Sequence, residues 1–110
     1  MKVSEVAEKL NLKVLTNNSG MEKEVKGGYS CDLLSWVMSH GSKSNAWITV
    51  QVHPNIVAVA LLAEFSCIII PENIEVDRVT LDKANQENIA ILQGEESAFE
   101  ICGKLKELGI

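Results

Sequence analysis

The chain has 110 residues, of which 46% are apolar and 23% are charged, enough for one domain with a hydrophobic core but too few for two. Fifteen acidic residues against ten basic residues give a net charge of −5. This balance argues against nucleic-acid binding, because a phosphodiester backbone is itself negative. Three cysteines, Cys31, Cys67 and Cys102, are widely spaced and form no C-x-x-C motif, so we expect free thiols in a reducing compartment.

No segment has the composition of a secretory signal or a membrane span. Glu5, Glu8 and Lys9 lie within the first ten residues, where a signal peptide would be apolar. The most apolar stretch, Pro54–Pro71, is bracketed by prolines and contains Glu64, which indicates buried elements of a fold rather than a span. We therefore expect a cytoplasmic protein without a membrane partner.

The first part of the chain predicts a short helix followed by extended segments. Apolar residues recur at helical spacing after Ser4, which we expect to cap this helix. Leu12–Thr16 has the pattern of a short strand, and Asn17–Gly20 has the residues of a turn. A brief extended piece, Glu22–Lys26, then leads to two glycines.

The pair Gly27-Gly28 stands before an apolar run that predicts a helix from Cys31 to about His40, capped by Ser30. Two interpretations remain open. The glycines can form a tight turn between strand and helix, or they can form a loop that, with Tyr29, binds a ligand at the positive end of the helix. Neither the P-loop spacing nor the third glycine of a dinucleotide motif is present.

A cysteine in the first turn of that helix would be placed for reactivity. No base is spaced to activate Cys31, however, so we interpret it as an ordinary cysteine. Cys67 and Cys102 lie in apolar patterns and are predicted to belong to the core.

Strands and helices alternate through the rest of the chain. The expected elements are strands at Ala46–Gln51, Ser66–Ile70 and Ile89–Leu92 and helices at Glu75–Gln86 and Ser97–Leu108. This alternation predicts an α/β fold, a three-layer α/β/α sandwich with a mostly parallel sheet of about five strands, in a single domain over residues 1–110.

One further helix, Ile56–Ala63, is apolar on every side and follows the helix-start pair Pro54-Asn55. In a domain of this size we expect only one side of such a helix to face the sheet, which leaves the other side to be covered. A second copy of the chain is the economical cover and predicts a homodimer. A neighbouring helix of the same chain is the alternative.

A second candidate site lies where the strand Ala46–Gln51 meets this helix. Gln51, His53 and Asn55 are polar side chains at the carboxyl end of a strand, where open parallel sheets collect ligands. The alternative is that His53 or Asn55 caps the helix and Gln51 is simply exposed. His40 is most simply a surface residue at a helix C-terminus. No metal-ligand spacing and no nucleophile–base arrangement is present, so we expect no metal, no cofactor and no catalysis.

Taken together, several blocks resemble the DRTGG domain family across essentially the whole chain. The most specific are V-K-G-G-Y-x-x-D-L-L at Val25–Leu34 and Q-x-H-x-N-I-V-A-V-A at Gln51–Ala60. The glycines of the family motif fall on Gly27-Gly28, whereas Glu22-Lys23 stands where the acidic–basic pair of the motif belongs, so the motif is only partly kept.

The resemblance implies an α/β/α fold similar to the N-terminal domain of bacterial HPr kinase. Such domains occur in CBS-domain regulatory proteins and phosphotransacetylases and as small separate chains, and they are regarded as regulatory. We therefore expect a homodimeric, non-enzymatic module that binds a small polar or nucleotide-like ligand between the glycine pair and Gln51–Asn55. The alternative function is a protein–protein interaction module without a small-molecule site.

Overall fold

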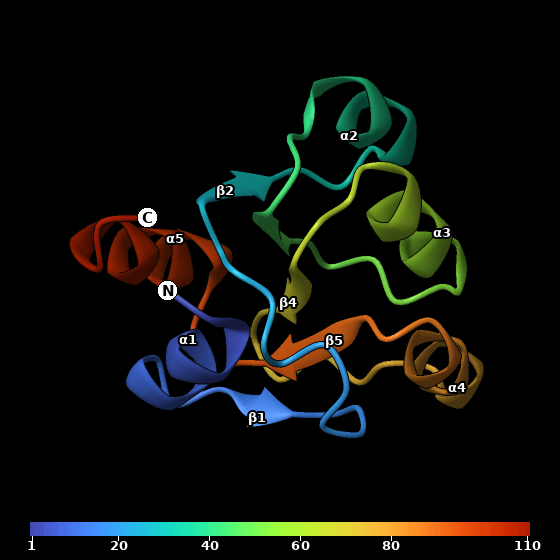
Figure 1. Ribbon diagram of the computed structural model, residues 1–110, viewed down its shortest axis with the longest axis horizontal. Helices are drawn as coiled ribbons and strands as arrows, with labels where there is room; N and C mark the ends of the chain where they lie inside the picture. The colour runs from blue at the N-terminus through green and yellow to red at the C-terminus, as the bar shows by residue number, and fades with distance from the viewer.

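The computed structural model describes all 110 residues, which form five strands and five helices (Figure 1). The strands are β1 (Lys13–Val14), β2 (Gly27–Ser30), β3 (Asn45–Ile48), β4 (Cys67–Ile70) and β5 (Ala90–Gln93). The helices are α1 (Val3–Lys9), α2 (Leu34–His40), α3 (Asn55–Leu62), α4 (Arg78–Gln86) and α5 (Ala98–Glu107).

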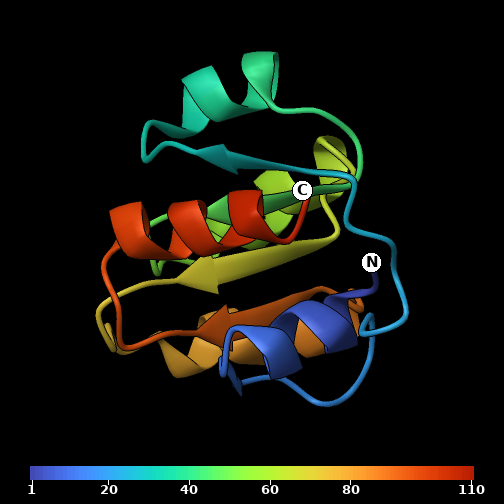
Figure 2. The ribbon, with the colours of Figure 1, turned by 90° about the vertical axis from the view of Figure 1, so that its left-hand side faces the viewer.

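The strands form one sheet in the order β1-β5-β4-β3-β2, in which only the pair β1–β5 is antiparallel. Helices α2, α3 and α4 lie on one face of the sheet, and α1 and α5 lie on the other (Figures 1 and 2). The predicted α/β/α sandwich with a mostly parallel sheet of five strands is confirmed.

The central strands are buried on both faces, as the apolar run of β4 shows. Cys67 and Ile69 pack with residues of α1 and α5, whereas Ile68 and Ile70 pack with residues of α2, α3 and α4. None of these four side chains is exposed to solvent, and each buried isoleucine contributes about 2 kcal/mol through the hydrophobic effect. This two-sided burial fixes the helical layers against the sheet.

The N-terminal elements differ from their predicted bounds. Ser4 is not the cap of α1: the helix starts at Val3, and the Lys2 backbone N–H donates to the Glu5 carboxylate (2.9 Å). The strand expected over Leu12–Thr16 shrinks to the two residues of β1. The segment Glu22–Lys26 forms no strand; its only β-type pairing is an isolated bridge between Glu24 and Lys2, the residue before α1. The backbone groups of this segment bond instead to the start of the chain and to Ser44, as in Val3 N–H to Lys23 (2.9 Å) and Lys26 N–H to Ser44 (2.9 Å).

Boundaries of later elements also move, by up to three residues. The strand predicted over Ala46–Gln51 begins one residue earlier and ends at Ile48, and the helix predicted from Glu75 begins at Arg78. At α5, the hydroxyl of Ser97 accepts from the Glu100 backbone N–H (3.2 Å), as an N-cap residue does.

The apolar helix α3 is the middle helix of its layer, between α2 and α4 (Figure 1). Ile56, Val57, Val59 and Ala60 are buried within the single chain, and Leu62, at 72% exposed, is the large apolar side chain of α3 that remains most open to water. The premise that a second copy must cover this helix is therefore wrong, because its two neighbouring helices do so. The homodimer itself stays a prediction.

Two glycines give a matched test of the packing. A Cβ on Gly41 would lie 2.3 Å from Cζ of Phe65, a buried ring that packs against Trp47 and cannot move away. A Cβ on Gly103, within α5, would meet nothing within 4 Å. We expect Gly41→Ala to lower the free energy of unfolding by about 1–3 kcal/mol through overpacking and Gly103→Ala to raise it by about 0.5–1 kcal/mol. Urea denaturation measures both, and equal effects of the two substitutions would contradict this packing.

Candidate functional site

The pair Gly27-Gly28 lies within the edge strand β2, so both predicted structures for it, a turn and a loop at a helix N-terminus, are wrong. Gly27 pairs with Asn45 of β3 and Gly28 pairs with Ala46. A Cβ on Gly27 would lie 2.8 Å from Nδ2 of Asn45. At this position the glycine therefore permits a close approach between the strand and the Asn45 side chain.

Helix α2 starts three residues later than predicted, at Leu34, and Ser30 does not cap it. Cys31 consequently lies between β2 and α2 rather than in a helical turn, which removes the reason to consider its thiol reactive. Of the two cysteines predicted to belong to the core, Cys67 is fully buried, and this burial raises the pKa of its thiol to about 12. Cys102 is only partly buried beside the core.

Asp32 joins the ends of β2 and β3. One oxygen of its carboxylate accepts from the Thr49 hydroxyl (2.8 Å) and from the Val50 backbone N–H (2.9 Å). The Gln51 side-chain amide donates to the Asp32 backbone carbonyl (3.0 Å). This network occupies the polar groups after Ile48, which explains why β3 ends there.

The other predicted site residues lie next to this network, at the start of α3. The Asn55 backbone N–H donates to Nδ1 of His53 (3.2 Å), so His53 contributes to the start of the helix. Gln51 is half-buried, while His53 and Asn55 are exposed. None of the three principal cavities of the molecule is lined by these three residues. His40, at the C-terminus of α2 as predicted, stacks on the Trp36 ring with centroids 3.8 Å apart.

A groove of about 410 Å³ runs along β2, beside α5. Its floor includes Gly28 and Ile48, and Leu105 of α5 forms a wall. Lys26 and Lys106 also line it, and neither lysine makes an ion pair. The predicted residues Gly27, Gly28 and Tyr29 all line this groove, whereas Gln51, His53 and Asn55 lie outside it. The two halves of the predicted site are thus linked only through Asp32 and Gln51.

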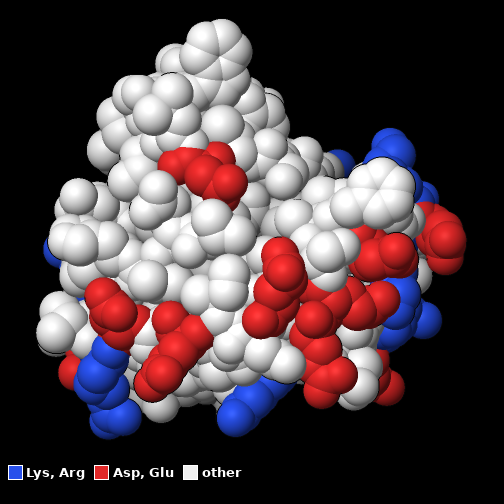
Figure 3. All heavy atoms as spheres, turned by 180° about the vertical axis from the view of Figure 1, so that it is seen from behind, with Lys and Arg blue, Asp and Glu red and all other residues white.

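The carboxyl ends of β2, β4 and β5 carry acidic residues in the segments that follow them. Figure 3 views this side of the molecule and shows many acidic side chains over its lower half. The acidic residues in these segments are Asp32, Glu72, Glu75, Asp77, Glu95 and Glu96. Backbone hydrogen bonds from Glu72 to Glu96 (2.9 Å) and from Asn73 to Gly94 (2.8 Å) join the last two segments. The carboxyl ends of the strands therefore repel anions, and the groove along β2 is the better place for an anionic ligand.

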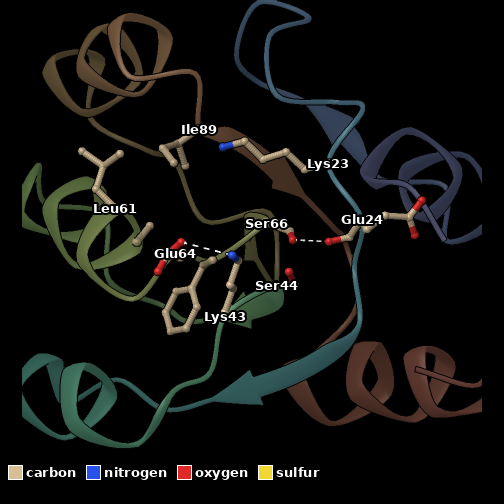
Figure 4. Close-up of a pocket in the computed structure, with 10 residues that line it drawn as sticks. Lys23, Glu24, Lys43, Ser44, Leu61, Glu64, Ser66 and Ile89 are labelled. Carbon is tan, nitrogen blue, oxygen red and sulfur yellow. Dashed lines mark hydrogen bonds and ion pairs between the residues drawn. The ribbon is translucent and has the colours of Figure 1, made fainter.

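A pocket of about 400 Å³ that the sequence did not indicate lies at the amino-terminal ends of the central strands (Figure 4). Its basic side chains already have partners, since Lys43 pairs with Glu64 (3.6 Å) and Lys23 donates to the Asn88 carbonyl (2.9 Å). The Ser66 hydroxyl donates to the Glu24 carbonyl. These contacts give the pocket's polar groups a structural role at the ends of α3 and α4.

No three His, Cys, Asp or Glu side chains lie close enough together to hold a metal ion. None of the helices has both the length and the apolar character needed to span a membrane.

No protein-family model matches the sequence, and no curated protein matches it. Five chains of solved structures are similar to it. One is the region containing the CBS and DRTGG domains of the regulatory region of a pyrophosphatase from Clostridium perfringens, in complex with its activator diadenosine tetraphosphate. The TM-score is 0.72 at 13% sequence identity, and the similarity covers 91% of this chain and 44% of that one. The two proteins therefore share a fold.

Removing the Asp32 carboxylate should destabilise the protein. The Asp32→Ala substitution leaves the nearly buried Thr49 hydroxyl and the Val50 N–H without their acceptor, which we expect to lower the free energy of unfolding by about 1–3 kcal/mol. Asp32→Asn keeps an acceptor oxygen and should cost less than half as much. Urea denaturation measures both against Asp82→Ala, which removes an exposed ion pair with Arg78. An Asp32→Ala variant no less stable than Asp82→Ala would contradict this role.

Proposed function

We propose that this chain is a non-catalytic regulatory module that binds a small nucleotide-like ligand in the groove along β2. The observation that carries the proposal is the combination of an apolar floor with two unpaired lysines, Lys26 and Lys106, in a groove of about 410 Å³. Ligand pockets of this kind usually measure about 300–1,000 Å³. The bare backbone at Gly28 admits a flat base, and the lysines attract phosphate.

Two further observations support this function. The shared fold is that of a regulatory region, and that region was solved with a nucleotide activator. The acidic carboxyl edge of the sheet disfavours phosphate there, which leaves the groove as the site with suitable charge. We also propose that the chain belongs to the DRTGG family, because Val25–Leu34 and Gln51–Ala60 resemble that family. Its three free cysteines support a further proposal, that the protein acts in the cytoplasm.

Ligand binding predicts a rise in melting temperature with ATP or diadenosine tetraphosphate. At one hundred times its Kd, a ligand adds about 2.7 kcal/mol to the free energy of unfolding, or about 10 °C for a domain of this size. Gly28→Val should abolish the rise by filling the groove, since a Cβ at Gly28 has only ordinary contacts, 3.7 Å from the Ala46 carbonyl and 3.9 Å from Leu105. Gly103→Ala, outside the groove, is the matched control.

Calorimetric titration with the same nucleotides and with tripolyphosphate separates the contributions of base and phosphate. Equal binding to the wild type and to Gly28→Val would place the ligand elsewhere. If no nucleotide changes the melting temperature or gives a binding heat, the alternative of an interaction module without a small-molecule site is favoured.

We further propose a homodimer, now through exposed apolar side chains at the start of α2, on α2 and on α3 rather than through the outer side of α3 alone. Leu33 is 63% exposed, Trp36 is 50% exposed and Leu62 is 72% exposed. Helix α2 carries no charged residue other than its terminal histidine, so two copies of a chain with net charge −5 can meet there with least repulsion.

Light scattering during size-exclusion chromatography tests the dimer. We expect a mass near twice 12.0 kDa at micromolar concentration for the wild type. The double substitution Trp36→Glu and Leu62→Glu should restore the monomer mass by placing like charges at the interface. A wild-type mass of 12.0 kDa would remove the dimer from the proposal and leave the ligand groove untouched.

A further inference from the structure

The outer side of β2 is open. The strand pairs only with β3 and stands at one end of the sheet, while the other end is closed by the two-residue, antiparallel β1. An open edge presents unpaired backbone donors and acceptors to any extended chain. In β2 the direction of these groups follows from the ladder: the Cys31 N–H donates to the Ile48 carbonyl of β3 (3.3 Å) and Ser30 pairs with Ile48. Tyr29 and Cys31 therefore direct their backbone groups to β3, whereas Gly28 and Ser30 direct theirs outward.

This edge lacks the usual protection against pairing. Proteins cover exposed edges with lysines, prolines, bulges or a crossing helix, but β2 consists of Gly27, Gly28, Tyr29 and Ser30. None is charged, none is proline, and the two glycines leave the backbone without side-chain cover. Helix α5 lies beside one face of the strand, not across its edge, and between them lies the groove (Figure 1).

We infer that an extended acidic segment of a partner protein adds to β2 as a sixth strand. Alternate side chains of an added strand point to opposite faces of the sheet, so every second one would enter the groove. There it would meet the apolar floor at Ile48 and Leu105 and the charges of Lys26 and Lys106. A partner segment that fits this groove therefore carries both apolar and acidic residues on the same face of the added strand.

The same lysines argue against a second copy of this chain as the added strand. A symmetric antiparallel pairing of two β2 strands brings Lys26 and Lys106 of both copies to one seam. The nearest acidic residue after β2, Asp32, has one carboxylate oxygen bonded to Thr49 and Val50, and a seam of two copies would bring four lysines to only two such carboxylates. An acidic partner gains from this charge, whereas a second copy is repelled by it. The inference goes beyond the proposed ligand and does not depend on it.

Peptide binding tests the inference without any nucleotide. The probes are fluorescein-labelled heptapeptides that alternate valine with threonine and carry two glutamates, one peptide for each placement of the glutamates. Fluorescence anisotropy should show binding of at least one acidic peptide, and the same peptide with lysines in place of glutamates should bind about tenfold more weakly. A central proline should abolish binding, because it removes a donor and breaks the ladder.

Charge reversal in the protein supplies the matched control. We expect Lys26→Glu with Lys106→Glu to reverse the preference, so that the lysine peptide binds more tightly than the glutamate peptide. Lys83→Glu, an equivalent change on exposed α4, should leave the preference unchanged. In ¹⁵N spectra, the amide signals of Gly28 and Ser30 should shift most on addition of the acidic peptide.

Each contrary result overturns the inference. The inference is wrong if no peptide of the set binds at about 1 mM, or if acidic and basic peptides bind equally well. It is also wrong if the proline-substituted peptide binds as well as its parent, or if the amide shifts are confined to α2 and α3. Broadening of the β2 amides on concentrating the protein alone, together with a dimer mass that Trp36→Glu with Leu62→Glu does not abolish, would assign the edge to a second copy instead.

Discussion

Burial of both faces of the central strands is the constraint on which the rest of this structure depends. Strands β3, β4 and β5 carry apolar side chains on both sides, so each face must be covered by helices. Three helices, α2, α3 and α4, cover one face, but only α1 and α5 are available for the other. The core on that second face draws on β3, β4 and β5 and includes no residue of β2. The groove along β2 is the part of the sheet that two helices leave uncovered.

Charge also distinguishes the carboxyl ends of the strands from the open edge of the sheet at β2. The segments after the parallel strands are acidic, and those segments after β4 and β5 are joined to each other by backbone hydrogen bonds. The end where α/β proteins commonly hold ligands is thus negative and largely occupied by its own contacts. At the edge, Lys26 and Lys106 are unpaired. Two lysines without ion pairs therefore lie beside the strand whose backbone is least covered.

The glycine pair shows why local sequence is an incomplete guide to the site. Before an apolar helix, Gly27-Gly28 has the composition of a turn or an anion-binding loop, and both interpretations follow from local chemistry. Its strand conformation comes instead from pairing with Asn45 and Ala46, some eighteen residues away. Similarly, the groove needs Leu105 and Lys106 from the last helix, which no motif near the glycines could indicate. Gly27, Gly28 and Tyr29 do line this groove, and their role in ligand binding stays a prediction.

The sequence by itself determined the α/β layering, the order of helices and strands and the two-sided burial of Ser66–Ile70, because hydrophobic periodicity and β-branched runs act within a few residues. It also placed the last helix to within one residue at each end, because an apolar stripe is a local pattern. Only the tertiary structure decided that α3 is covered by α2 and α4, that β2 is an open edge and that Gln51, His53 and Asn55 lie outside the groove. These features depend on which distant segments become neighbours, and the energy of such contacts is not written in any short stretch of the chain.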